Sequence, residues 1–299
     1  MPIGKSIRVY LADATVTGIR YAELVNWTGQ ALACPRNRLA ELPAWPEVAK
    51  PGVYFLFEGR LSEAKPLAYI GESENVSGRL SSHDRNKEFW NEAVIFTSKD
   101  ENLTKAHIKF LESTLVGIAK RADRYDLENG NTPPESSLPR ADRDAMAEFV
   151  ENVRMVLGIL GYPILEPLLR TRAPDQQISS AESSISEPNP LNDLVFRVNN
   201  ITAYGAVTDE GFVLKKGSQV SKTSTESAAK VIAARERHMA AGILIPNDDL
   251  LVTTEDILVS SSSYAAAIVA GTSRSGPQSW KASDGRTLKE IEDASLPLA

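Results

Sequence analysis

Residues 52–71 read GVYFLFEGRLSEAKPLAYIG, and this stretch decides the fold of the region around it. It contains two short runs rich in aromatic and β-branched residues, separated by a polar loop with glycine and proline. Such runs favour β-strands, and a short loop of this kind between them predicts a hairpin. We therefore predict two adjacent strands, the first carrying Tyr54 and the second carrying Tyr69.

The elements that follow predict a small sheet flanked by helices. A third strand is predicted over residues 93–98, because the run AVIFTS is apolar and β-branched. Apolar residues recur at helical spacing over residues 103–122 and again over 140–157, so two helices are predicted there. The expected fold class is α+β, with a small antiparallel sheet and helices in the core and a smaller α+β domain behind it.

The chain is expected to divide at a segment rich in Ser, Pro, Gln and Glu. Residues 173–192 contain no aromatic residue and cannot bury enough apolar surface to offset the entropy of ordering them. We interpret them as a linker between a core domain at 51–172 and a C-terminal domain at 193–299. Prolines and a glycine near position 50 suggest that residues 1–50 are an N-terminal extension of the core domain.

Composition narrows the class of protein. The 299 residues carry a net charge of −6 and a single cysteine, Cys34, which excludes an internal disulfide framework and a cysteine-cluster metal site. The net charge argues against a protein that coats nucleic acid through a basic overall charge. No apolar run reaches the about 20 residues that a membrane-spanning helix needs. The sequence starts without the pattern of a secretory signal, so we expect a cytoplasmic protein with no membrane partner.

The hairpin residues and those after them resemble the GIY-YIG nuclease family. The sequence has GVY at residues 52–54 and YIG at residues 69–71, with Val53 in place of the isoleucine of the first motif. The resemblance covers about residues 50–165. The further matching positions are Arg79, His83 four residues later, Glu112 inside the helix predicted over residues 103–122, and Asn131 in the loop that follows that helix.

The resemblance implies hydrolysis of phosphodiester bonds at one divalent metal ion, Mg²⁺ or Mn²⁺. Glu112 would be the metal ligand, since Mg²⁺ takes one or two carboxylates and fills its other positions with water and phosphate oxygens. Arg79 would hold the phosphate with its planar guanidinium fork. Tyr54 and Tyr69 would converge on the attacking water. We prefer Tyr69 as the base, with His83 or Tyr54 relaying the proton.

Each of these residues also has an ordinary structural interpretation when it is taken alone. Strand tyrosines usually pack in a core, helical arginines and glutamates usually lie at the surface, and asparagine is common in Asn-Gly turns. The functional interpretation depends on all of them occurring together in the order of the family. A second hypothesis of a different class therefore stays open, namely a non-catalytic module that binds nucleic acid or protein on the same fold.

The C-terminal domain resembles a module of unknown function that is often found behind GIY-YIG domains. The matching segments are GFVLKKGS, AAAIVAG, Trp280 and DGRTL at residues 284–288. We expect it to recognise the target or to bind a protein partner. The expected partner of the whole chain is nucleic acid, with DNA favoured over RNA, while its oligomeric state is left open.

Overall fold

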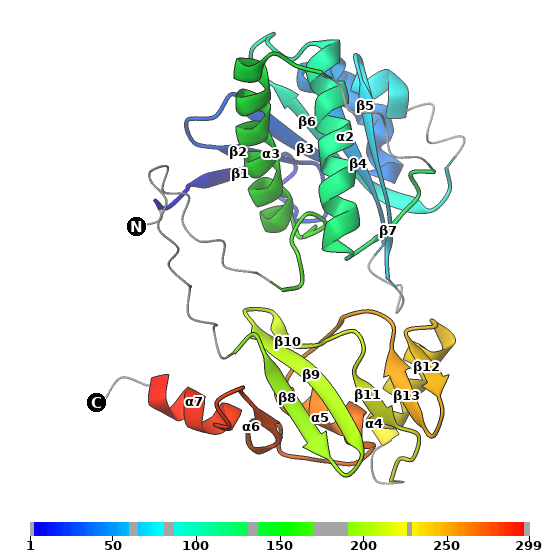
Figure 1. Cartoon of the computed structure of the whole chain (residues 1–299). Helices are drawn as coiled ribbons and strands as arrows, with labels where there is room; N and C mark the ends of the chain where they lie inside the picture. Colours follow the sequence, from blue (N-terminus) through cyan, green and yellow to red (C-terminus); the bar gives the residue numbers. More distant parts are fainter. Residues whose placement is uncertain are drawn as a thin grey trace. The chain divides into compact units, whose positions relative to one another are not determined.

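The computed structural model describes residues 3–59, 65–80, 87–130, 137–169, 191–225 and 229–295. The chain divides into two compact units, Met1–Pro167 and Leu168–Ala299 (Figure 1). Each unit has its own hydrophobic core and combines helices with a mainly antiparallel sheet, so the predicted α+β class is confirmed. Among the described residues, no helix is both long enough and apolar enough to cross a membrane.

The first unit is built on a seven-stranded sheet with the order β1-β2-β3-β6-β4-β5-β7. Neighbouring strands are antiparallel, except that β5 and β7 run parallel. β4 therefore lies inside the sheet, with β6 on one side and β5 on the other. The strands are β1 (Ile7–Leu11), β2 (Arg20–Leu24), β3 (Gly29–Pro35), β4 (Gly52–Glu58), β5 (Leu67–Ser73), β6 (Trp90–Ser98) and β7 (Asp126–Leu127).

β4 and β5 are the two strands of the predicted hairpin. They pair in antiparallel register, with Tyr54 opposite Gly71 and Leu56 opposite Tyr69. The two faces of β4 are buried in different cores, because Val53 and Phe55 belong to one apolar cluster whereas Tyr54 and Leu56 belong to another. A strand that is buried on both faces needs apolar residues at every position, which explains the unbroken run in the sequence.

The helices α2 (Lys105–Ala122) and α3 (Arg140–Leu160) cover one face of this sheet (Figure 1). α2 begins after Thr104, whose hydroxyl accepts a hydrogen bond from the His107 backbone N–H at 3.5 Å. The His107 ring in turn accepts from the Thr104 backbone N–H at 3.2 Å, which satisfies two free donors of the first turn. The apolar stripe of α2 packs into the core through Ile108, Leu111 and Leu115.

The opposite face of the sheet is covered by shorter elements. These are two 3₁₀ helices, η1 (Arg36–Ala44) and η2 (Pro46–Ala49), and a helical segment at residues 76–80. Leu42 of η1, Val48 of η2 and Leu80 are all buried in the cluster that contains Tyr54. The tyrosine hairpin thus lies between two covering layers.

The expected boundary near residue 50 is not a boundary between compact units. β3 pairs with β6 along its whole length, from Gly29 opposite Ser98 to Pro35 opposite Glu92. The first 50 residues therefore extend the core sheet by three strands, and the observed division falls at Pro167 instead. Residues 173–190 of the expected linker lie outside the described residues.

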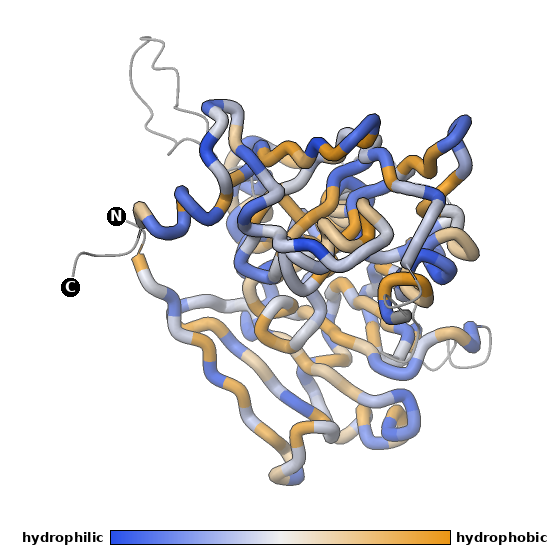
Figure 2. Tube along the Cα trace, turned by 90° about the horizontal axis from the view of Figure 1, so that it is seen from below, coloured by the Kyte–Doolittle hydropathy of each residue, from blue (hydrophilic) through white to orange (hydrophobic). Residues whose placement is uncertain are grey.

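The second unit contains a five-stranded sheet with the order β14-β10-β9-β8-β15 and a three-stranded sheet with the order β11-β13-β12. Hydrophobic and hydrophilic residues alternate along several strands (Figure 2), as expected where one face of a sheet is buried and the other is open. The strands are β8 (Leu194–Val198), β9 (Ile201–Thr208), β10 (Gly211–Leu214), β11 (Gln219–Ser221), β12 (Leu244–Asn247), β13 (Leu250–Thr253), β14 (Ile257–Val259) and β15 (Trp280–Lys281).

Trp280 organises the core of the second unit. Its ring centre lies 5.4 Å from that of Phe196 and 4.7 Å from that of Phe212, and its indole N–H donates to the Ser262 carbonyl at 2.9 Å. A buried indole needs such a partner for its N–H. The helices around this core are α4 (Ala229–Ala240), α5 (Ser262–Ala270), α6 (Gly276–Ser279) and α7 (Leu288–Ser295).

We predict that Gly52→Ala destabilises the first unit. A Cβ at Gly52 would lie 2.2 Å from the Phe96 carbonyl oxygen, and that backbone cannot retreat without breaking the pairing of β4 with β6. The free energy of unfolding in urea should fall by about 1–3 kcal/mol, the usual cost of overpacking. In Gly158→Ala, the matched control in α3, the new Cβ meets nothing within 4 Å, so stability should be unchanged or higher. Equal stabilities for Gly52→Ala and the native chain would contradict this account.

Candidate functional site

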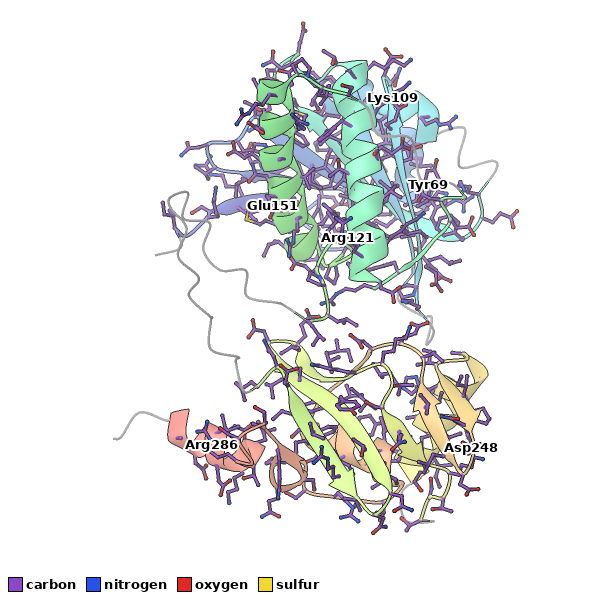
Figure 3. All side chains as sticks on the ribbon, in the orientation of Figure 1. Tyr69, Lys109, Arg121, Glu151, Asp248 and Arg286 are labelled. Atoms are coloured by element: carbon purple, nitrogen blue, oxygen red, sulfur yellow. The ribbon has the colours of Figure 1, made fainter. Side chains whose placement is uncertain are left out.

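Tyr54 and Tyr69 lie on the same face of the β4–β5 pair as diagonal neighbours. Their ring centres are 6.2 Å apart and the ring planes are inclined by 39°. Tyr54 is completely buried, whereas Tyr69, which is labelled in Figure 3, is partly exposed. The predicted proximity of the two tyrosines is therefore observed, with Tyr69 the more accessible of the two.

Gly71 provides the space that the two rings occupy. A Cβ at this position would lie 2.4 Å from the Tyr54 hydroxyl oxygen and 2.9 Å from Cε1 of Tyr69. No L-residue with a side chain fits there while both rings keep their positions. The glycine of the second motif is thus explained by the tyrosine pair itself.

Arg79 is hydrogen-bonded to both tyrosines. It lies in the helical segment that follows β5, where its backbone N–H donates to the Asn75 carbonyl at 3.2 Å. The hydrogen bond with Tyr54 is the largest cause that raises the pKa of the Arg79 guanidinium above its usual value, and Tyr69 adds a smaller contribution. The site therefore contains a cation that is held against two phenol oxygens.

The two tyrosines differ in their hydrogen-bonding roles. Burial is the main cause that raises the pKa of Tyr54 above its usual value. Its hydroxyl also donates to the Tyr69 oxygen, which raises the pKa of Tyr54 and opposes the rise at Tyr69. The pKa of Tyr69 is raised mainly by burial and then by the charge of Glu112, while Arg79 opposes the rise. The hydrogen bond with Arg79 therefore supports the charged form of both tyrosines, and the bond between the two hydroxyls favours the charged form at Tyr69.

Glu112 reaches this group from the middle of α2. Burial raises the pKa of its carboxyl to about 7, and the negative charge of Glu72 contributes to the rise. The backbone N–H of Glu72 donates a hydrogen bond to the Glu112 carboxylate and acts in the opposite direction. Glu72 directly follows the YIG motif, so β5 carries both the Tyr69 hydroxyl and a second carboxylate to the neighbourhood of Glu112.

The donor set at Glu112 fits a hard divalent cation. It consists of carboxylate oxygens from Glu112 and Glu72, and the mutual repulsion of these two groups would be relieved by a positive ion. Within the described ranges, no group of three or more His, Cys, Asp or Glu side chains is arranged to hold a metal ion. From the described residues, a metal here would take one or two ligands, Glu112 and Glu72, and water or substrate oxygens can fill its other positions.

The structure thus brings together four of the six predicted site residues, namely Tyr54, Tyr69, Arg79 and Glu112. The other two predicted residues, His83 and Asn131, lie outside the described residues. Their assignment to the site stays a prediction.

Asn129 is a structural residue of the site that the sequence analysis did not select. Its side-chain oxygen accepts from the Ile70 backbone N–H at 3.1 Å, and its side-chain nitrogen donates to the Ile70 carbonyl at 2.7 Å. The amide therefore extends the short parallel pairing of β7 with β5 and fixes the backbone between Tyr69 and Gly71. Residues 129–131 read Asn-Gly-Asn, and this motif drew attention to the loop. The sequence analysis selected its second asparagine, Asn131, whereas the first, Asn129, forms the contact with Ile70.

Lys87 places a second positive charge at Tyr69. Its Nζ lies 4.4 Å from the centre of the Tyr69 ring and 3.7 Å from a carboxylate oxygen of Glu128. Lys109, on α2 three residues before Glu112 (Figure 3), favours the charged form of Glu112. The acidic and phenolic groups are thus accompanied by cations that a phosphate could contact.

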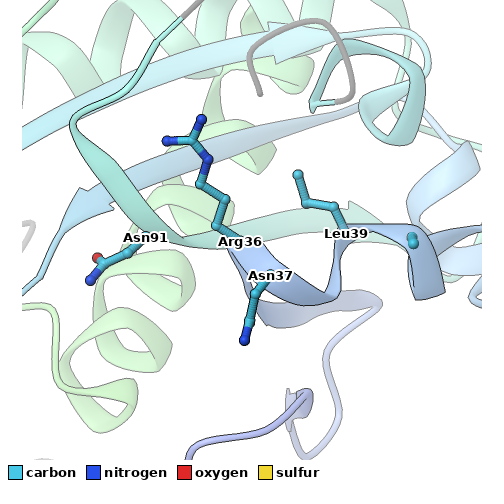
Figure 4. A pocket seen from close by; sticks show the side chains of 5 residues that line it. Arg36, Asn37, Leu39 and Asn91 are labelled. Atoms are coloured by element: carbon cyan, nitrogen blue, oxygen red, sulfur yellow. The ribbon is translucent and has the colours of Figure 1, made fainter. Parts of the chain in front are cut away.

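A separate groove of about 690 Å³ lies between η1 and the beginning of β6 (Figure 4). Arg36 there donates to the carbonyls of Glu88 at 3.0 Å and Trp90 at 3.2 Å, and its guanidinium stacks 5.0 Å from the Trp90 ring centre. These contacts explain Arg36 as a structural residue. The groove is lined by Arg36, Asn37, Leu39, Ala40 and Asn91, none of which belongs to the tyrosine site.

Comparison with known proteins gives one match. Residues 194–292 match the family model of a domain of unknown function, DUF4357. This agrees with the resemblance expected for the C-terminal domain. No curated protein and no solved structure matches the chain. The resemblance of the first unit to GIY-YIG nucleases has no such match and stays a prediction from its residues.

We predict that Glu112 makes the stability of the metal-free protein depend on pH. Its pKa of about 7 in the folded protein lies above the ordinary value of 4.5, so the folded state keeps a proton that the unfolded chain releases between these pH values. The free energy of unfolding should therefore fall as the pH rises from about 5 to about 8.

The measurement compares Glu112→Gln with the native chain by urea unfolding in EDTA. At about pH 8 the variant should be the more stable by roughly 1–3 kcal/mol, and near pH 4 the difference should vanish. Glu148→Gln, an exposed position on α3, is the matched control and should leave the pH dependence unchanged. A Glu112→Gln curve parallel to that of the native chain would show that Glu112 titrates normally.

Proposed function

We propose that the first unit is a Mg²⁺-dependent endonuclease that hydrolyses phosphodiester bonds in nucleic acid, with DNA as the expected substrate. The observation that carries this proposal is the hydrogen-bonded group of Arg79, Tyr54 and Tyr69 beside the carboxyl of Glu112. A packing role alone does not call for a cation, two phenols and a carboxyl with a raised pKa in one place. Perturbed groups of this kind cluster at functional sites.

Arg79 and Lys87 are suited to hold the phosphate. Arg79 is exposed, so its fork can contact two phosphate oxygens while it stays hydrogen-bonded to the tyrosines. Lys87, above the Tyr69 ring, offers a second contact from the same side. Positive groups that are fixed before the substrate binds stabilise the charge that develops on the phosphate during attack.

Tyr69 is the assigned base for the attacking water. The water oxygen forms a new bond to phosphorus, the water proton passes to the deprotonated Tyr69 oxygen, and a phosphorus–oxygen ester bond breaks, with the leaving oxygen taking up a proton from solvent. A free tyrosine has a pKa near 10, so its deprotonated form needs support at neutral pH. The hydrogen bonds from Tyr54 and Arg79 to its oxygen provide part of that support.

Glu112 would hold the ion, with Glu72 as the neighbouring oxygen donor. Mg²⁺ accepts such a set, and Mn²⁺ suits the same oxygen ligands. When bound, the ion supplies positive charge against the phosphate oxygens. The half-buried position of Glu112 limits its contacts with water, and its carboxyl accepts a hydrogen bond from the Glu72 backbone and interacts electrostatically with Tyr69.

We predict that Glu112→Gln abolishes most cleavage while binding persists. The amide keeps the size of the side chain but lacks the charge that holds the ion, so single-turnover cleavage should slow by at least about 10²-fold. Binding of labelled DNA in EDTA should be unchanged, and Glu148→Gln should cleave normally. Cleavage by Glu112→Gln near the native rate would contradict the assignment. A native chain that binds but never cleaves with Mg²⁺ or Mn²⁺ would support the non-catalytic alternative.

We predict that Arg79→Lys separates phosphate binding from packing. Lysine keeps the charge and most of the apolar stem but lacks the guanidinium fork. Single-turnover cleavage should slow by about 10²-fold, in the range of other single-donor removals. The free energy of unfolding should stay within about 0.5 kcal/mol, as for surface changes.

Arg121→Lys, at an exposed position near the end of α2, is the matched control and should change neither the rate nor the stability. An unchanged rate for Arg79→Lys would remove Arg79 from the mechanism. A large loss of stability would identify it as a packing residue.

A further inference from the structure

The five-stranded sheet of the second unit has one packed face and one partly open face. Along β8 and β9 the residues alternate, with Phe196 and Ala203 in the core and Arg197 and Tyr204 exposed. Figure 1 shows α5 behind β9, on the packed side. Toward β10 the other face is closed, because Ala206 and Val213 are fully buried. The open part of the face thus belongs to β15, β8 and the first half of β9.

The strand register places an aromatic ring among basic residues on this open part. Lys281 lies opposite Val195, and Val195 lies opposite Tyr204. On the other side, the Lys215 backbone N–H donates to the Tyr204 carbonyl at 2.8 Å. Arg197, opposite Thr202, is the diagonal neighbour of Tyr204, at a Cβ separation of roughly 7 Å. On this face Tyr204 therefore has Lys215 on one side, Arg197 as its diagonal neighbour, and Lys281 two strands away beyond Val195.

Tyr204 is exposed but firmly anchored. Its side chain is 45% exposed, while its backbone N–H donates to the Ser218 hydroxyl at 2.9 Å. Ser218 itself is completely buried and also bonds the Lys215 carbonyl at 2.6 Å. Directly behind the ring, a Cβ at Gly205 would lie 2.4 Å from the Phe212 ring, so the core side is tightly packed. A rigid backbone that presents an exposed ring is a platform on which a flat group can stack.

The charge of this surface is opposite to that of the whole chain. The chain carries −6, yet Arg197, Lys215 and Lys281 share the open face; the acidic residues that interact with them in the described part of the chain include Asp193 and Glu290, which interacts with Lys281. Asp193 pairs with Lys215 at 2.8 Å. Arg197 forms no ion pair with any residue in the described part of the chain. A local positive surface on an acidic protein indicates a specific anionic partner rather than general attraction.

We infer that this open face binds single-stranded nucleic acid. An unpaired base would stack on the Tyr204 ring, and the phosphates on either side would contact Arg197 and Lys281. Stacking platforms of one aromatic ring with flanking cations bind single strands with little sequence preference, because every base has a flat face. In a duplex the faces of the bases are stacked on one another, so no base is free to stack on the Tyr204 ring. This inference is independent of the chemistry proposed for the first unit.

The experiment measures binding of a labelled 15-nucleotide oligo(dT) to the full chain by fluorescence anisotropy. The buffer contains EDTA, so a failure of the proposed nuclease activity cannot affect the result. Tyr204→Ala should weaken binding by about 10-fold or more, whereas Tyr204→Phe, which keeps the ring, should bind like the native chain. Arg197→Gln should weaken binding and lower the slope of log K against log salt by about 0.7, the contribution of one phosphate contact.

Two matched controls remove equivalent groups elsewhere. Tyr10→Ala removes a tyrosine of β1 that is 59% exposed, and Lys289→Gln removes an exposed charge from α7. Both should bind normally, and melting curves should show that every variant is folded. Oligo(U) in place of oligo(dT) reports whether RNA shares the surface. Equal binding by Tyr204→Ala and the native chain, tighter binding of a duplex than of a single strand, or no binding of oligo(dT) would each overturn the inference.

Discussion

The arrangement of the first unit depends on one constraint, the register that sets Tyr54 opposite Gly71. β4 is the strand between β6 and β5, and its side chains alternate between two different cores. A slip of one residue would turn the tyrosine face toward α2 and α3 and bring a side chain against the Tyr54 ring. The same pairing that closes the hydrophobic core therefore fixes the spacing of the two phenols. Fold and site are specified together, since neither can change without the other.

The electrostatics of the site follow from placing polar groups where water is scarce. A buried phenol such as Tyr54 needs a hydrogen-bond partner, and a partly buried carboxyl such as Glu112 loses hydration. Hydrogen bonds from nearby groups replace part of the lost hydration. Tyr54 is hydrogen-bonded to Arg79 and Tyr69, and the Glu112 carboxylate accepts from the backbone N–H of Glu72. The compensation at Glu112 is incomplete, because its pKa stays near 7. A positively charged ligand would stabilise the ionised form of such a carboxyl. A fully paired surface carboxylate has no need of one.

Residue type and hydrophobic periodicity predicted the individual strands and helices, because these depend mainly on neighbouring residues in the sequence. The tyrosine hairpin, α2 and α3 were all expected from residue type and periodicity, and four site residues could be named from their order along the chain. What the sequence did not reveal was non-local pairing. β3 joins β6 across about sixty residues, and nothing within GQALACP indicates its partner. Asn129 acts through the backbone of Ile70, and only the parallel contact of β7 with β5 brings the two together. The place of residues 1–50 in the sheet and the role of Asn129 both depend on such non-local contacts.

The two functions that we propose place opposite physical demands on the two units. Shifted pKa values require burial, so the tyrosine site lies between the central sheet and its covering layers, with Tyr54 fully buried and Tyr69 and Glu112 partly buried. Recognition of a flexible anionic strand requires the reverse, an exposed ring and mobile cations on a rigid support. The sheet behind Tyr204 supplies that support through a dense aromatic core of Phe212 and Trp280. One surface could not meet both demands, because the burial that tunes a carboxyl would also prevent a strand from lying across it. Separate cores allow each surface to be optimised without disturbing the other.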